Sequence, residues 1–251
     1  MSAHDKKTYS HKLEITLHNP WSQAFWDQLL PIKNRISQHP FFLGFASGQL
    51  SLACVRYALL NFYPLVAHFP SYMAMNLAKA TDFRLSGVTD TRTWLIQNIK
   101  VEERHLFWYQ DWASGFGLTV QALDQVCPPP AMNAVNHFLW NTNYRCGLAE
   151  GIAATNLAIE WATSDWTVQV YKGIKNYINH QDVVINTKTM AWLRAHALYD
   201  DIHPYEAMEL VKRLCDHDPD MQKKALHAAE QGLAYYELAL DECYKIQLAS
   251  D

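Results

Sequence analysis

Apolar residues recur every three or four positions along most of the chain, which is the period of an α-helix. The first such segment begins after Asn19-Pro20 and stops before His39-Pro40, because a residue that precedes proline avoids the helical region. The pattern predicts helices over about 20–38, 51–79, 89–116, 131–162 (as one helix or interrupted), 166–178, 187–199, 205–215 and 221–248.

Helix-capping residues and helix breakers refine this pattern. Ser51 suits the N-cap of the second helix, and Gly117 suits the C-terminal cap of the third. Pro64 and Pro70 should kink the second helix. Strand signals are nearly absent, with 9 Gly in all and no Asn-Gly or Asp-Gly hairpin turn. We therefore predict an all-α fold.

The clearest break in the chain is the proline run 128–130. We interpret it as a loop inside one bundle rather than as a domain boundary, because the candidate metal ligands described below lie on both sides of it. Residues 1–251 are then a single helical domain, in which residues 1–18 form a flexible or peripheral N-terminal segment.

Composition and charge exclude several classes of function. Hydrophobic residues make up 49% of the chain, enough for a sizeable core. The net charge of −4 and the lack of a basic stripe argue against a nucleic-acid partner. The longest apolar stretch, 57–77, is broken by polar residues and prolines, so we expect no membrane span. A polar N-terminus unlike a signal peptide and 5 Cys without a CxxC pair favour a cytoplasmic protein.

Two short motifs contain candidate metal ligands. Glu102 and His105 lie three residues apart, so a helix presents both on one face, with the Glu-x-x-His spacing of carboxylate-bridged di-iron bundles. His196, Asp200 and His203 lie at positions i, i+4 and i+7 of a second helical face. Either motif alone is more often a solvated helix face. Their joint occurrence in one helical chain indicates a metal site.

A third segment, GLAEGIAATNLAIEW, places acids at Glu150 and Glu160 in an otherwise apolar helix. Buried charges cost several kcal/mol unless they are paired or coordinated, so acids and histidines that share a core imply a cation. Imidazole and carboxylate are ligands that Fe(II) favours where positions stay open for O2, and no thiolate falls in these segments. Manganese is the alternative metal for the same ligands.

The segments HPFFLGFASGQLS and VRYALLNFYPLVAHFPSYMA resemble the opening of the haem-oxygenase-like superfamily, which includes the TenA-type thiaminases and the pyrroloquinoline-quinone synthase PqqC. The segments NIKVEERHLFWYQDWASGFGL, EGIAATNLAIEW and HALYDDIH resemble its iron-dependent branch. The resemblance covers about residues 20–215 and implies a single-domain helical bundle of the TenA/PqqC type. Within that branch the chain is most similar to the UndA-type oxidative decarboxylases of medium-chain fatty acids.

The resemblance implies a set of ligands for one or two Fe(II) ions. Relatives that oxidise other substrates space the first pair as Glu-x6-His, whereas this chain has Gln110 at that distance from Glu103, so the short spacing favours the decarboxylases. Glu150 matches no ligand and is expected either to support a ligand side chain or to be structural. Glu160, the second acid of the EGIAATNLAIE helix, matches the bridging glutamate. The full set of positions that match the family's ligands is Glu102, His105, Glu160, His196, Asp200 and His203.

The implied reaction converts a medium-chain fatty acid such as dodecanoic acid to a terminal alkene, 1-undecene, and CO2, with O2 as co-substrate and an external reductant. The carboxylate would bind iron, and the alkyl chain would lie along the second helix, where the candidate wall residues are Phe62, Leu65, Phe69 and Tyr72. One open alternative is a related iron oxidase that acts on an amino acid or amine.

The other open alternative is a metal-free enzyme of the TenA or PqqC kind. Thiaminases of the TenA type need a catalytic cysteine, and no cysteine of this chain lies in a comparable motif. The identity of the electron donor stays open, as does the choice between a monomer and a dimer.

Overall fold

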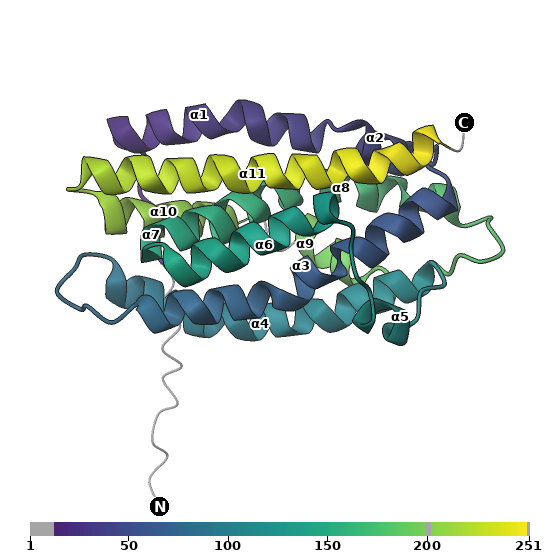
Figure 1. Cartoon of the computed structure of the whole chain (residues 1–251), viewed down its shortest axis with the longest axis horizontal. Coiled ribbons are helices and arrows are strands. Elements are labelled where there is room, and N and C mark those ends of the chain that lie inside the picture. Colours follow the sequence, from purple (N-terminus) through teal and green to yellow (C-terminus); the bar gives the residue numbers. More distant parts are fainter. Residues whose placement is uncertain (1–12, 199–201, 250–251) are drawn as a thin grey trace, which may run out of the picture.

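The computed structural model describes residues 13–198 and 202–249, and no strand occurs in this part of the chain. Its longer helices are α1 (Pro20–Ser37), α3 (Leu52–Lys79), α4 (Val88–Gly115), α6 (Pro130–Arg145), α8 (Glu160–Gly173), α10 (His203–Cys215) and α11 (Pro219–Leu248). The shorter elements are α2 (Pro40–Ser47), α5 (Val120–Asp124), α7 (Leu148–Ile152), the π-helix η1 (Ala153–Ile159), the 3-10 helix η2 (Ile174–Tyr177) and α9 (Ala191–Leu198). The long helices run roughly along the longest axis of the molecule (Figure 1), which confirms the predicted all-α bundle.

The helix ends predicted from capping residues are confirmed. The Asn19 side chain accepts a hydrogen bond from the backbone N–H of Ser22 at 3.0 Å, and α1 begins at the next residue, Pro20. Ser51 accepts in the same way at the start of α3. Gly117 follows α4 with a φ of 81°, the left-handed conformation that glycine adopts past a helix end. These contacts satisfy backbone groups that the helices leave without partners.

The structure decides two boundaries in the middle of the chain. The segment 131–162, predicted as one helix or interrupted, is interrupted at Cys146–Gly147, between α6 and α7. The predicted break between 162 and 166 is wrong, because α8 runs without interruption to Gly173. The hydroxyl of Ser164 donates to the carbonyl of Trp161 at 3.0 Å, so the polar residues that suggested a break are accommodated within the helix.

Helix α2 was not predicted. It begins directly after the predicted stop at His39-Pro40. The His39 ring accepts a hydrogen bond from the backbone N–H of Phe41 at 3.1 Å, and Pro40 takes the first helical position, where its missing N–H costs nothing. The same residues that end α1 therefore start a second, shorter helix.

Helix α3 is the one described helix that is long and apolar enough, by length and composition, to cross a membrane. It packs against α4, α6 and α11 inside the bundle, which is the place of a core helix. The helix continues through Pro64 and Pro70 and changes direction along its length (Figure 1), as the two prolines predict.

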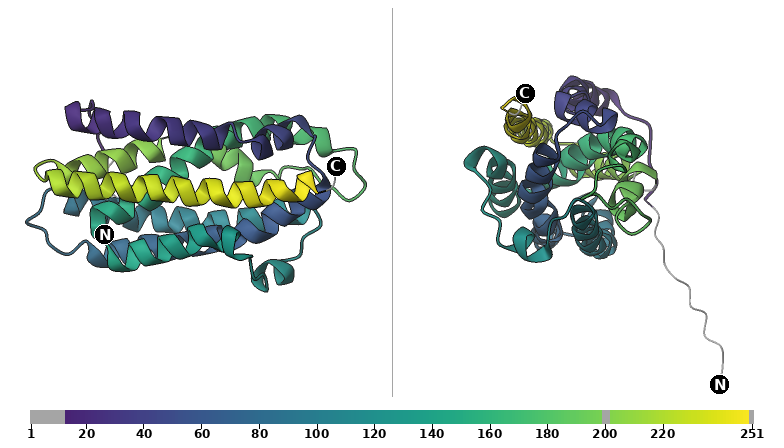
Figure 2. Two further views of the ribbon diagram at one scale, coloured as in Figure 1. Left: turned by 45° about the horizontal axis from the view of Figure 1, so that its top comes forward. Right: turned by 90° about the vertical axis from the view of Figure 1, so that its right-hand side faces the viewer.

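The π-helix η1 lies at the centre of the bundle. All seven of its residues are buried, and it packs against α11, α10, α6 and α3. Gly232 of α11 makes this packing close, because a Cβ there would lie 3.1 Å from the carbonyl oxygen of Ala154. The end-on view in Figure 2 shows the helices gathered around the long axis of the bundle.

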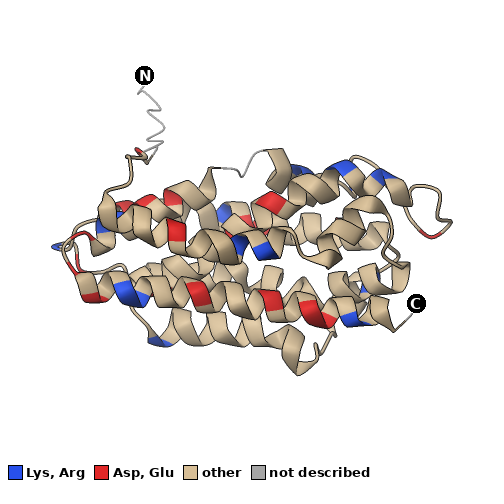
Figure 3. Cartoon of the chain, turned by 90° about the horizontal axis from the view of Figure 1, so that it is seen from above, with Lys and Arg blue, Asp and Glu red and all other residues tan. Residues whose placement is uncertain are grey.

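Charged residues lie mainly along the outer faces of the helices. On the face shown in Figure 3, basic positions are interspersed with acidic ones, and no continuous row of basic positions is visible. Arg35 of α1 and Glu237 of α11 form one of the ion pairs between helices, with Arg35 Nη2 2.9 Å from Glu237 Oε2. Exposed pairs of this kind contribute little to stability, so the apolar core holds the bundle together.

Candidate metal centre

Five of the six predicted ligands line a single internal cavity. They come from four helices that are distant in sequence, α4, α8, α9 and α10, and are Glu102, His105, Glu160, His196 and His203. The sixth, Asp200, lies outside the described residues. His196 lies in α9 and His203 is the first residue of α10, so the two histidines reach the cavity from two described helices rather than from one helical face.

The ligand side chains pair with one another. His105 Nδ1 lies 3.0 Å from Glu102 Oε2, and His203 Nδ1 lies 3.4 Å from Glu160 Oε2. The rings of His105 and His196 have centroids 4.6 Å apart. The negative charge of Glu102 also raises the pKa of Glu160, so the two imidazole–carboxylate pairs interact electrostatically. The cavity therefore holds two acids and three imidazoles in one connected cluster.

The spacing of this cluster is not that of a closed coordination sphere. Within residues 13–198 and 202–249, no group of three or more His, Cys, Asp or Glu side chains has the arrangement needed to hold a metal ion. The chemistry of the donors nevertheless fits Fe(II), since imidazole nitrogen and carboxylate oxygen are its usual protein ligands. Glu102 is 8% exposed and the Glu160 side chain 15%, so a cation would compensate charges that are costly to bury.

His196 is held as a neutral imidazole. Its Nδ1 lies 2.9 Å from the backbone carbonyl oxygen of Trp192, which places the proton on Nδ1, so Nε2 is the nitrogen that would ligate a metal. The ring stacks on Trp192, with centroids 3.9 Å apart. Burial lowers the pKa of His196 well below its ordinary value, and the nearby His105 and His203 lower it further. A neutral imidazole is the form that binds a metal.

Glu160 opens helix α8 directly after the π-helix η1. Burial raises the pKa of Glu160, and the Glu102 charge adds to this effect, while His203 and Asn156 oppose it. Single π-helical turns inside longer helices occur frequently at functional sites, where they redirect side chains. Glu150, which was expected either to support a ligand side chain or to be structural, lies beside Gly147 at the start of α7 and does not line this cavity.

The rest of the cavity wall is apolar. Phe62, Leu65 and Phe69 of α3 line it as predicted, but Tyr72 does not. Tyr72 is fully buried and donates a hydrogen bond to the Asn136 side chain of α6. Tyr72 lies seven residues after Leu65 and therefore on nearly the same face of α3, so rotation does not separate them. It lies about two turns further along the helix and past Pro70, where α3 has left the cavity.

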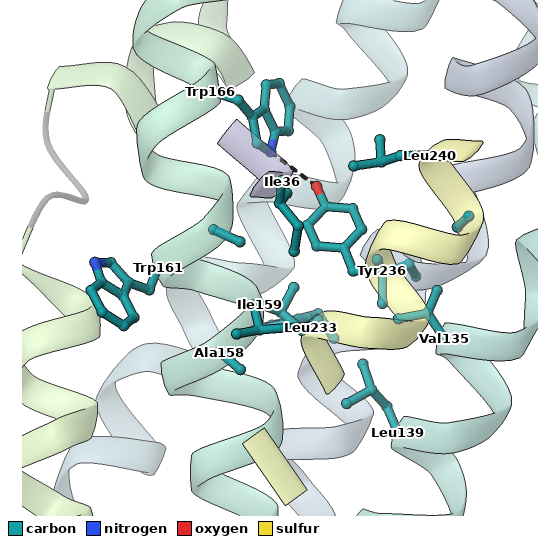
Figure 4. Packing of buried hydrophobic residues seen from close by; sticks show 14 of the residues in the cluster. Ile36, Val135, Leu139, Ala158, Ile159, Trp161, Trp166, Leu233, Tyr236 and Leu240 are labelled. Carbon is teal, nitrogen blue, oxygen red and sulfur yellow. Dashed lines mark hydrogen bonds between the residues drawn. The ribbon is translucent and has the colours of Figure 1, made fainter. Parts of the chain in front are cut away.

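Sequence reasoning missed most of the aromatic wall. The short helix α2 contributes Phe42, which stacks on Trp166 of α8 with centroids 4.2 Å apart. Figure 4 shows Trp166 facing Tyr236 of α11, and its indole N–H donates to the phenol oxygen at 3.0 Å. The apolar run after His39-Pro40 was the one available signal for α2. The other lining residues that were not predicted are Phe41, Phe45, Ala58, Leu59, Val66, Tyr109, Trp112, Ile159, Thr163, Ser164 and Trp192.

The chain is similar both to a known protein family and to solved structures. The sequence profile of a haem-oxygenase-type family, described as iron-containing redox enzymes, matches residues 56–237. A solved TenA homolog from Pseudomonas syringae pv. tomato is 31% identical, with a TM-score of 0.85 over 93% of this chain and 96% of that chain. A comparison with curated proteins finds no match.

More distant structures share the fold. A domain of unknown function with a heme oxygenase-like fold from Shewanella denitrificans is 15% identical, with a TM-score of 0.74 over 92% of this chain and 94% of that chain. A TenA homologue from Pyrococcus furiosus is 15% identical, with a TM-score of 0.68 over 87% of this chain and 99% of that chain. At this identity the likeness shows the fold alone, and it confirms the predicted haem-oxygenase-like, TenA-type bundle.

Proposed function

Because this chain belongs to the haem-oxygenase-like family of iron-containing redox enzymes, we propose that it binds non-haem Fe(II) and uses O2 to oxidise a substrate held in its central cavity. The observation that carries the proposal is the composition of that cavity. Two carboxylates and three imidazoles from four helices meet there, and most of the remaining wall is aromatic or aliphatic. Such a concentration of costly polar groups in an apolar cavity is expected where a functional metal is bound.

The proposed ligands of one or two Fe(II) ions are Glu102, His105, Glu160, His196, Asp200 and His203. Bound iron would supply the one-electron chemistry that activates O2. The protein's own residues keep His196 neutral, hold the carboxylates at the cavity surface and exclude water from the reacting groups. The aromatic wall orients the substrate, and this wall sets which substrates fit.

We propose a medium-chain fatty acid, such as dodecanoic acid, as the substrate. The described lining residues include no Lys or Arg, so a substrate carboxylate would find its counter-charge at the metal. Each methylene buried against the wall contributes about 0.8 kcal/mol, so a chain of this length gains most of its affinity from apolar contacts with residues such as Phe62 and Leu65. The length of the wall should then select the length of the acid.

The proposed reaction is an oxidative decarboxylation. The acid loses its carboxyl group as CO2 and one hydrogen from the β-carbon, and a double bond forms between the α- and β-carbons. Two electrons come from the substrate and two from an external reductant, and with O2 and two further protons they give two molecules of water. Dodecanoic acid would yield 1-undecene.

The test is to incubate Fe(II)-loaded protein with dodecanoic acid, O2 and a reductant, and to assay the headspace for a terminal alkene. An alkene one carbon shorter than the acid, absent with the His196→Ala variant, is the expected result. Iron-dependent O2 consumption without an alkene from any medium-chain acid would exclude the decarboxylase. It would direct the search to an amino acid or amine as the substrate of the same iron oxidase.

The similarity to a TenA homolog at 31% identity favours one other candidate, a metal-free enzyme of the thiaminase kind. That activity is expected to need a nucleophilic cysteine, and none of the described residues that line the cavity is a cysteine. Incubation of chelator-treated protein with thiamine separates the two candidates. Hydrolysis that persists without metal and in the His196→Ala variant would support the metal-free enzyme.

A further inference from the structure

Asn156 of the π-helix η1 contacts the proposed bridging carboxylate directly. Its amide Nδ2 donates to Glu160 Oε1 at 2.9 Å, while the other carboxylate oxygen, Oε2, faces His203. Both oxygens of Glu160 therefore have a protein partner, one from the preceding turn of its own helix and one from α10. Contacts of this kind fix the orientation of a ligand side chain before a metal binds.

Burial of the Asn156 side chain destabilises the folded protein. The residue is fully buried, and its Oδ1 has no hydrogen-bond partner among the described residues. A buried acceptor without a partner costs about 1–3 kcal/mol. Rotating the amide by half a turn would not remove this cost, because Oδ1 would then face the Glu160 carboxylate. A leucine of similar size would avoid the penalty, so stability alone does not account for asparagine here.

The π-helix holds Asn156 in a fixed register. The neighbouring Thr155 Oγ1 accepts from Asn143 Nδ2 at 2.7 Å, and Asn143 Oδ1 accepts from Asn76 Nδ2 at 2.7 Å. This chain of buried polar groups ties η1 to α6 and α3. On the other side, Gly232 of α11 packs close to the η1 backbone. Asn156 therefore has little freedom to move away from Glu160.

We propose that Asn156 is a positioning residue for the metal centre, which holds the Glu160 carboxylate toward the cavity and thereby strengthens metal binding. The inference rests on the proposed function, because it assigns Asn156 a role toward the same metal. Asn156 does not act on the substrate, and its effect passes through Glu160. Loss of an outer residue that orients a metal ligand typically weakens metal affinity by about 10–100-fold.

The test is a titration of metal-free protein with Co(II), read from the visible absorption bands that report its coordination, and repeated anaerobically with Fe(II). The variants are Asn156→Leu, which keeps the size and loses the amide, and Asn156→Ser, which is smaller and leaves room for water. Thr167→Val is the matched control, because it removes a buried hydroxyl from α8, the helix of Glu160, whose hydrogen bonds stay within that helix and which does not line the cavity. Each variant is also combined with Glu160→Gln.

The expected result is metal affinity about 10–100-fold weaker for both Asn156 variants, with changed Co(II) bands, and unchanged affinity and bands for Thr167→Val. In the Glu160→Gln background, Asn156→Leu should cause no further loss, because the two residues act as one unit. Wild-type affinity and bands in Asn156→Ser would overturn the inference, as would full additivity with Glu160→Gln. Wild-type protein that binds neither metal would overturn the proposed function as well, so the two failures are distinguishable.

Discussion

A buried ion cluster on α10 gives the clearest prediction of how stability depends on pH. Glu209 is 3% exposed and accepts hydrogen bonds from Lys212 Nζ at 2.7 Å and Arg213 Nε at 2.9 Å. The backbone N–H and hydroxyl of Thr16 also donate to it, which ties the N-terminal segment to α10. Burial alone would raise the pKa of Glu209, but these hydrogen bonds lower it to about 2 from its ordinary value of 4.5.

This difference in pKa translates into stability. Each pKa unit corresponds to about 1.4 kcal/mol, so the ionised Glu209 contributes about 3 kcal/mol at neutral pH. Because the folded pKa lies below the unfolded one, the contribution is complete above pH 4.5 and is lost as the pH falls toward 2. The Glu209→Gln variant lacks this contribution and leaves Lys212 without its buried counter-charge, which costs about 3–5 kcal/mol in comparable pairs.

The assay is urea unfolding of wild-type protein and Glu209→Gln at pH 7, 5, 4 and 3, followed by circular dichroism. The two free energies of unfolding should differ by about 3 kcal/mol or more at pH 7 and converge as the pH falls below 4.5. Glu242→Gln, which breaks an exposed pair with Lys245, is the control and should cost at most about 1 kcal/mol. A difference between wild type and Glu209→Gln that stays constant from pH 7 to 3 would refute the reasoning.

Three further predictions concern the cavity and its supports. Leu65→Trp should shift product formation toward shorter acids, whereas Tyr72→Phe, outside the cavity, should leave the chain-length preference unchanged, as measured with a series of fatty acids. His196→Ala should lower the bound metal per chain without changing the helical circular dichroism. Gly173→Ala should destabilise the protein by at least about 1–3 kcal/mol in urea unfolding, because its Cβ would lie 1.8 Å from the backbone oxygen of Ala46 and force α2 away from α8.

Local sequence signals predicted the parts of the fold that depend on local chemistry. Asn19, Ser51 and Gly117 mark helix ends because their side chains or backbone conformation satisfy groups only a few residues away. Glu102 and His105 were identifiable for a similar reason, since three-residue spacing places both on one face of whichever helix contains them. In the folded bundle Glu102 and His105 line the same cavity as Glu160, as the resemblance to the iron-dependent branch implies.

Features that depend on distant contacts were not predictable from the same signals. The π-helix η1 is part of an apolar stretch with ordinary helical periodicity, and its register depends on packing against Gly232 of α11. The aromatic wall combines Phe42, Trp166 and Tyr236, which are far apart in sequence and meet only in the folded bundle. Tyr72 was wrongly assigned to this wall, because a proline-containing helix of 28 residues offers no local marker of which turn leaves the cavity.

The charge of the cavity predicts that acid and metal bind cooperatively. The described lining offers a fatty-acid carboxylate no Lys or Arg, and Glu102 and Glu160 repel it. An uncompensated buried carboxylate costs several kcal/mol, so dodecanoate should bind at least roughly tenfold more tightly to protein loaded with Co(II) than to metal-free protein. Linkage requires that dodecanoate strengthen Co(II) binding by the same factor, which calorimetry measures from both directions. Equal affinity for dodecanoate with and without metal would show that the carboxylate is bound elsewhere, and the cavity would then not be the site of an acid's oxidation.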